Sequence, residues 1–239
     1  MLALPFGTIL KAALIAGLAA GLTASVFHLV FTEPLIDRAV ALEAHDHVAD
    51  DVNEPALVSR DTQRKGLVVG FVLLGLTWSL IFGIAFQAAQ RWLPATSRFR
   101  QGLVMALLAY WSVALLPFLK YPANPPGVGD AETIGLRQAL YAAFLVLSIS
   151  SVFLGGWLAR SVLPALSRGM GLAAPGWAGV AVLGVIVFMA MPSAAVEVTI
   201  PADLLSTFRI ASLAGLTVFW STMGLLFGKL ISGGPVRAA

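Results

Sequence analysis

Long apolar stretches set the fold class of this 239-residue chain. Each stretch is long enough to cross about 30 Å of hydrocarbon at a helical rise of about 1.5 Å per residue. Inside lipid the backbone must satisfy its own hydrogen bonds, and the chain has no alternating barrel pattern, so each stretch is predicted to be a helix. The stretches run over residues 9–31, 66–90, 102–119, 136–159, 175–192 and 207–231. We therefore expect an all-α fold, a polytopic transmembrane helical bundle of about six spanning helices (five to seven).

The charge content supports a membrane-embedded chain. Only 11% of the residues are charged, whereas a soluble domain carries about 25%. The first apolar stretch is longer than the core of a secretory signal and lacks a clear cleavage site, so we expect it to be retained. Without a linker or an internal repeat, the sequence predicts a single bundle domain over 1–239. An acidic, histidine-bearing loop is expected at 32–65 and a proline- and glycine-rich loop at 120–135.

Small residues at four-residue spacing predict close contacts between helices. The first stretch carries Ala13, Gly17 and Gly21, and the second carries Gly66 and Gly70. The alternative is that these residues reflect only the general abundance of glycine and alanine in membrane helices.

The charged residues divide between the two sides of the predicted bundle. Six crossings place both termini on one side, which then carries eight Lys and Arg residues and no acid. The other side carries seven basic residues and all twelve carboxylates. By the positive-inside rule, the basic residues in the compact turn from Arg91 to Arg100 favour termini in the cytoplasm. We expect a multi-pass protein of a bacterial inner membrane, with the acidic side facing outward.

The segment from residue 28 to residue 54 gathers the groups that bind cations. It holds all three histidines, His28, His45 and His47, and seven of the twelve carboxylates. His28 lies near the outer end of the first apolar stretch. An ionisable residue at membrane depth is a functional candidate, because burying it has a cost. The alternative is an interfacial histidine bonded to a backbone carbonyl.

Two further groups in this segment could bind a cation. After Pro34 the sequence predicts a short amphipathic helix, on which Glu33 and Asp37 are i, i+4 neighbours facing water or a pore mouth. His45 and His47 would grip one ion if that stretch were extended, whereas on a helix they would lie about 200° apart. With Asp46 and the acids after it, they suit a borderline divalent ion such as Co, Ni, Zn or Mn. Solvated structure without a ligand accounts equally well for both groups.

The loop KYPANPPGVGD, from Lys120 to Asp130, is the most distinctive in the chain. Its prolines have no N–H, so their carbonyls and the amide of Asn124 remain free acceptors, which hard cations accept. The minimal interpretation is a rigid cap between two helices. The predicted metal-binding residues are therefore His28, Glu33, Asp37, His45, Asp46, His47 and Asn124. No Walker A, GxSxG or HExxH motif is present, so we do not expect an enzyme.

The chain resembles the CbtA family of proposed cobalt transporter subunits. The resemblance is carried by FTEPLIDRAVALE, the HDH-bearing acidic loop and KYPANPPGVGDAETIGLRQALY. It implies uptake of Co²⁺, a transported ion rather than a permanently bound cofactor, for cobalamin synthesis. It also implies a small His-rich single-span partner, CbtB, with lipid and the metal ion as the other contacts and no nucleic acid.

Two other functions stay open at this point. One is a non-transporting membrane scaffold that recruits a metal-binding partner. The other is a carrier of an anionic substrate, met by Lys120, Arg137 and Arg209.

Overall fold

The structure is a computed structural model that describes residues 3–47, 58–91, 93, 97–126, 128–161, 173–193, 198 and 200–233. No strand occurs within these ranges. The helices are α1 (Phe6–Phe27), the π-helix η1 (His28–Thr32), α2 (Glu33–His47), α3 (Arg60–Ala89), α4 (Arg98–Ala109), the π-helix η2 (Tyr110–Leu115), α5 (Leu116–Lys120), the 3₁₀-helix η3 (Ala131–Thr133), α6 (Ile134–Ser161), α8 (Ala173–Ala190) and α9 (Ala202–Ser232). The predicted all-α fold is confirmed.

Five helical segments in the described ranges are long and apolar enough to cross a membrane. They run over Phe6–Leu42, Arg60–Ala89, Arg98–Lys120, Ile134–Leu158 and Ala202–Ser232, and Ala178–Ala190 is a shorter apolar helix. The first segment is longer than predicted, because α1 continues through η1 into α2 without a break. Pro34 lies in the first turn of α2, inside this continuous helix, so its missing N–H leaves one carbonyl of η1 without its helical donor.

The chain forms two compact units. Unit 1 comprises Met1–Leu107, Ala123–Val128 and Val198–Ala239, and unit 2 comprises Leu108–Pro122 and Gly129–Glu197. The proline- and glycine-rich loop is thus divided between the two units, and each is described by itself. The single bundle domain over 1–239 stays a prediction.

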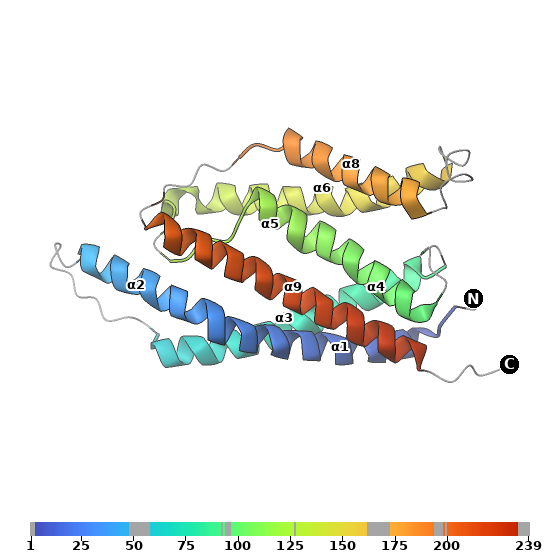
Figure 1. Ribbon diagram of the computed structural model, residues 1–239, viewed down its shortest axis with the longest axis horizontal. Coiled ribbons are helices and arrows are strands. Elements are labelled where there is room, and N and C mark those ends of the chain that lie inside the picture. Colours follow the sequence, from blue (N-terminus) through green and yellow to red (C-terminus); the bar gives the residue numbers. More distant parts are fainter. Residues whose placement is uncertain are drawn as a thin grey trace. The chain divides into compact units, whose positions relative to one another are not determined.

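In unit 1, α1 packs against both α3 and α9 (Figure 1). The approach to α3 is backbone against backbone: a Cβ on Gly17 would lie 2.4 Å from the carbonyl oxygen of Gly75, and one on Gly21 would lie 2.4 Å from that of Phe71. Ala13 is fully buried in the same unit. The predicted packing role of the small residues in α1 is therefore confirmed.

The corresponding prediction for the start of α3 is wrong. A Cβ on Gly66 or Gly70 would meet no described atom within 4 Å. The glycine of α3 that contacts α1 is Gly75, because the two helices come closest more than one turn further along α3 than the sequence spacing suggested.

Four helix ends meet at one end of unit 1. The amide of Leu4, before α1, donates to Gln90 Oε1 at the end of α3 (2.8 Å). The side chain of Gln101, near the start of α4, donates to the Gln90 carbonyl (3.0 Å). A Cβ on Gly102 would lie 2.6 Å from the Cα of Gly228, near the end of α9. The first helix, α1, therefore begins at the same end of unit 1 at which the last helix, α9, ends (Figure 1).

The described charges of unit 1 follow this arrangement. The end at which α1 begins and α9 ends carries basic side chains, namely Lys11, Arg91, Arg98, Arg100 and Lys229. The acids with described side chains, Glu33, Asp37, Asp61 and Asp203, all lie near the opposite end. Within this unit the predicted separation of charge is present, whereas the side that faces the cytoplasm stays a prediction.

Unit 2 is built from η2, α5, η3, α6 and α8. A Cβ on Gly155 would lie 2.8 Å from the backbone nitrogen of Val180, so α6 and α8 also approach through a glycine. Phe144 is fully buried, with the rings of Tyr121 and Phe188 edge-on to it at 5.6 and 6.4 Å.

Candidate functional site

Two carboxylates and two guanidinium groups interlock where α2 and α3 meet in unit 1. Arg60 Nη2 lies 2.9 Å from Glu33 Oε2 and 2.7 Å from Asp37 Oδ1. Arg64 lies 3.3 Å from Glu33 Oε2 through Nε and 2.6 Å from Asp37 Oδ2 through Nη2. The two acids carry a charge of −2 and the two arginines +2, so the cluster is neutral. We call these four residues the ion-pair cluster.

Local helix geometry explains how the cluster forms. The Ser59 hydroxyl accepts from the Thr62 amide (3.3 Å) and caps α3, so that Arg60 is its first residue. Arg60 and Arg64 are then one turn apart on α3, as Glu33 and Asp37 are on α2. The predicted i, i+4 arrangement of the two acids is confirmed.

Burial separates the two carboxylates. The side chain of Glu33 is 6% exposed, whereas that of Asp37 is 40% exposed. Glu33 is therefore a nearly buried charge that depends on both arginines for compensation. In this arrangement Glu33 Oε2 contacts both guanidinium groups, so a metal ion that binds this oxygen would have to displace them. The role of Glu33 and Asp37 as metal ligands stays a prediction.

His28 lies five residues before Glu33, about 7 Å deeper along the helix at about 1.5 Å per residue. It opens the π-helix η1 and is 9% exposed. Its Nδ1 lies 2.9 Å from Thr32 Oγ1, and its ring stacks on Phe71 of α3 with centroids 4.7 Å apart and planes at 18°. The described partner is thus a side-chain hydroxyl, not the backbone carbonyl of the alternative interpretation. Single π-turns inside α-helices often occur at functional sites.

A third element completes the surroundings of His28. A Cβ built on Gly215 of α9 would lie 2.2 Å from His28 Nε2 and 2.5 Å from Cε1. The imidazole therefore fills the space left by the missing side chain. Sequence reasoning missed both Phe71 and Gly215, because neither lies near His28 in the chain. Arg60 and Arg64, in contrast, are four residues apart in the sequence, as Glu33 and Asp37 are. This matching spacing indicates the ion-pair cluster.

His45, Asp46 and His47 form the last turn of α2. The backbone is helical there, so positions 45 and 47 lie about 200° apart around the axis. This is the less favourable of the two arrangements for sharing one ion. The side chains of these residues, and the acids at 50, 51 and 54, lie outside the described part, and their role as ligands stays a prediction.

Asn124 belongs to a small apolar cap on unit 1. Its Oδ1 accepts from Arg209 Nη2 of α9 at 2.8 Å. The neighbouring Ala123 packs on a buried cluster formed by Leu35, Ala39, Leu204 and Phe208. These contacts agree with the interpretation of the loop as a rigid cap. Asn124 as a metal ligand stays a prediction.

No group of three or more His, Cys, Asp or Glu side chains among the described residues is placed to hold a metal ion. The described part of unit 1 therefore offers an ion-pair cluster and a buried histidine rather than a preformed metal cage.

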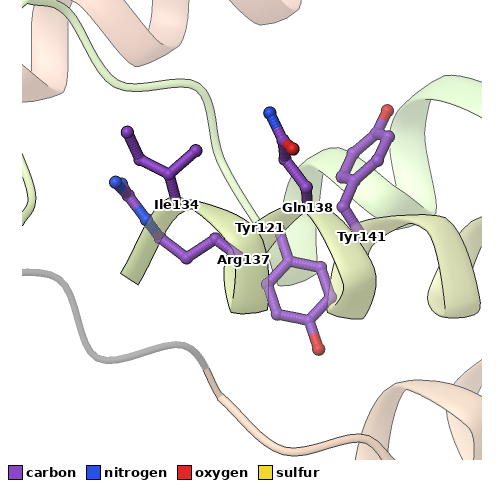
Figure 2. A pocket seen from close by; sticks show the side chains of 5 residues that line it. All are labelled: Tyr121, Ile134, Arg137, Gln138 and Tyr141. Atoms are coloured by element: carbon purple, nitrogen blue, oxygen red, sulfur yellow. The ribbon is translucent and has the colours of Figure 1, made fainter. Parts of the chain in front are cut away.

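Unit 2 has a shallow hollow lined by Tyr121, Ile134, Arg137, Gln138 and Tyr141 (Figure 2). Arg137 Nη2 donates to the Asp130 carbonyl (3.1 Å), and the Tyr121 hydroxyl donates to the Pro192 carbonyl (2.7 Å). Lys120 Nζ lies 4.9 Å from the centre of the Phe188 ring. Each of the three basic residues of the anion-carrier alternative thus has a partner within its own unit, since Arg209 binds Asn124 in unit 1.

A family model described as "Probable cobalt transporter subunit (CbtA)" matches residues 6–232. The chain belongs to the CbtA family. The resemblance drawn from the sequence is therefore confirmed, and with its apolar helices this CbtA-family chain is a multi-pass membrane protein of the transporter-subunit class. Comparisons with curated proteins and with solved structures found no match.

Proposed function

We propose that this chain is the membrane subunit of a Co²⁺ uptake system that supplies cobalamin synthesis. The observation that carries the proposal is the family match over residues 6–232, from the start of α1 to the end of α9. The direction is inward across a bacterial cytoplasmic membrane, with the end of unit 1 that carries the ion-pair cluster facing out.

The residues of unit 1 support a route for the ion. The end of α2, with His45 and His47, and the acids that follow it in the sequence capture the ion from outside. Glu33 and Asp37 then receive it at the mouth. A divalent cation carries the same charge as Arg60 and Arg64 together, so it can replace them on the two carboxylates without a net change in charge. His28 follows as the next ligand inward, and imidazole with carboxylate suits borderline divalent ions.

The membrane potential is a sufficient driving force. Moving one charge inward gains about 2.3 kcal/mol per 100 mV, so a divalent ion gains about 4.6 kcal/mol. At about 1.4 kcal/mol per tenfold change, this supports roughly a thousandfold accumulation. Uptake therefore requires no ATP-hydrolysing motif in this chain.

The family description as a subunit supports a second component. We propose a small single-span CbtB-like protein with a His-rich tail, which concentrates Co²⁺ near the mouth. The chain then supplies the route and the partner supplies ions to it.

Accumulation of radioactive cobalt tests the proposal in cells that lack other cobalt uptake. The cells express this chain, the small partner, both or neither, at low external Co²⁺. We expect accumulation to require this chain and to increase with the partner. His28→Ala should abolish it at unchanged protein level, whereas Ser206→Ala on the exposed surface of α9 should not.

The same cells distinguish the scaffold alternative. A scaffold would retain the small partner in the membrane, and accumulation would not respond to His28→Ala. That result would contradict a transport role for this chain.

A further inference from the structure

Gly215 has no conformational reason to be a glycine. It lies in the interior of the continuous helix α9 and is buried. Among the described residues only Gly129 has a positive φ. A glycine in the middle of a helix is less favourable than an alanine, because it loses more conformational freedom on folding. Another group must therefore occupy the volume that a side chain at position 215 would fill.

The imidazole of His28 occupies that space. A Cβ at position 215 would lie 2.2, 2.5 and 3.1 Å from Nε2, Cε1 and Cδ2, and these ring atoms are the three nearest to it. The ring cannot withdraw freely, because Phe71 stacks on one of its faces and Thr32 holds Nδ1 at 2.9 Å. A methyl group on α9 would thus push the ring away from both partners.

The ring orientation decides which nitrogen can meet an ion. A metal-binding histidine commonly donates one ring N–H to a neighbouring oxygen, which leaves the other nitrogen as the ligand. With Thr32 Oγ1 accepting from Nδ1, Nε2 is the nitrogen that can serve as a ligand. Nε2 is also the ring atom closest to Gly215. The residue at position 215 therefore controls the orientation of the ligand atom.

We propose that Gly215 is a positioning residue: its missing side chain gives the His28 imidazole a seat against α9, and transport of the cation past His28 depends on that seat. This inference rests on the proposed function for its link to transport. The seating itself is a separate physical statement and can be tested without transport.

A double-mutant cycle tests the seating on the purified full-length chain in detergent. The variants are Gly215→Ala, His28→Ala and the double variant, and the measurement is the thermal unfolding midpoint. We expect Gly215→Ala alone to lower the midpoint by several degrees. In the His28→Ala background the same substitution should cost nothing further, because the smaller side chain at position 28 leaves room for the new methyl group.

Gly224 of α9 is the matched control. A Cβ there would lie 2.6 Å from the Cβ of Ala106, so it clashes with a side chain on a different helix and not with His28. The cost of Gly224→Ala should be the same with and without His28. If Gly215→Ala also costs the same in both backgrounds, Gly215 serves helix packing alone and the proposal is overturned.

Cobalt uptake in cells then tests the role in transport. We expect Gly215→Ala to reduce uptake about 10- to 100-fold at equal protein level, as loss of a group that orients a metal ligand does. Gly66→Ala, which meets no described atom within 4 Å, should leave uptake unchanged. Normal uptake by Gly215→Ala would overturn the positioning role. Coupling in the unfolding cycle without uptake by the wild type would instead refute the proposed function and leave the seating established.

Discussion

The two units of this chain use the same packing device but differ in what they bury. In unit 1 Gly17 lies against the backbone of α3, and in unit 2 Gly155 lies against the backbone of α8. Among the described residues, the buried ionisable side chains, His28 and Glu33, belong to unit 1. The buried polar residues of unit 2 among the described ones are serines. The hydroxyls of Ser112 and Ser151 bond to carbonyls of the preceding helical turn, whereas that of Ser148 has no partner in the structure.

This difference separates packing from function. A serine bonded to its own helix adds little cost inside a membrane, whereas a buried carboxylate must be compensated by charged partners. Unit 1 provides these partners for Glu33 with Arg60 and Arg64 of α3, whereas the polar partner of His28 is Thr32 on its own helix. The comparison therefore supports unit 1 as the place of the proposed ion handling, whereas tight helix packing occurs in both units.

Among the variants that compare the two units, Glu33→Gln in unit 1 should have the largest effect. Removing one partner of a buried ion pair costs about 3–5 kcal/mol, and the 31% and 46% exposure of Arg60 and Arg64 reduces our expectation to about 1–3 kcal/mol. Thermal unfolding in detergent measures it. Cobalt uptake should also fall about tenfold, as for a loss of about 1.4 kcal/mol in ion binding.

Asp61→Asn is the control for Glu33→Gln. Asp61 pairs with Lys65 at 2.7 Å, but the two side chains are 74% and 76% exposed. Such pairs contribute about 0–1 kcal/mol, so neither the unfolding midpoint nor uptake should change appreciably. Equal effects at positions 33 and 61 would contradict the assignment of ion handling to the buried cluster.

The next effect tests packing in unit 2 through adjacent glycines. Gly155→Ala places a methyl group 2.8 Å from the backbone nitrogen of Val180, whereas Gly156→Ala meets no described atom within 4 Å. Overpacking costs about 1–3 kcal/mol, whereas Gly156→Ala should be neutral or gain up to about 1 kcal/mol. The thermal unfolding midpoints of both variants measure this difference in stability. A cost at both positions would contradict the contact between α6 and α8.

A smaller effect is expected for Asn124→Ala in the cap of unit 1. It removes the acceptor of Arg209 Nη2, and Arg209 Nε is already buried without a partner in the structure. A hydrogen bond to a charged group contributes about 1.5–3 kcal/mol, and partial solvent access to Arg209 lowers the expected cost to about 1 kcal/mol. If Asn124 is also a metal ligand, as the sequence predicts, cobalt uptake falls by more than the loss of stability accounts for. A change in stability alone would favour the rigid cap.

The smallest effect concerns Tyr121→Phe in unit 2. It removes one hydrogen bond to Pro192, worth about 0.5–1 kcal/mol. Burial raises the pKa of the Tyr121 phenol, so the folded state favours the protonated form. Its contribution to stability is present below the unfolded pKa of about 10 and is lost as the pH rises through the higher folded pKa. The unfolding midpoint should therefore change less between about pH 8 and 11 in the variant than in the wild type. Uptake at neutral pH should not change.

Some contacts of the site were readable in the sequence and others were not. Glu33 and Asp37 one helical turn apart predict a shared face, and the arrangement is present. The same spacing in Arg60 and Arg64 indicates their partners once the two helices are paired. Phe71 and Gly215 carry no such signal, because their roles depend on which helices adjoin His28 and at what height.

The sequence by itself determined the class of fold, the family and the separation of charge along the chain. Hydrophobicity and charge act on each segment alone, since every apolar stretch must be helical in lipid whatever its neighbours are. Only the tertiary structure decided that α1 meets α3 at Gly75 rather than at Gly66 or Gly70, and that the His28 ring fills the space beside Gly215. Such contacts depend on the distance and register between helices, which are set by the packing of all their side chains together.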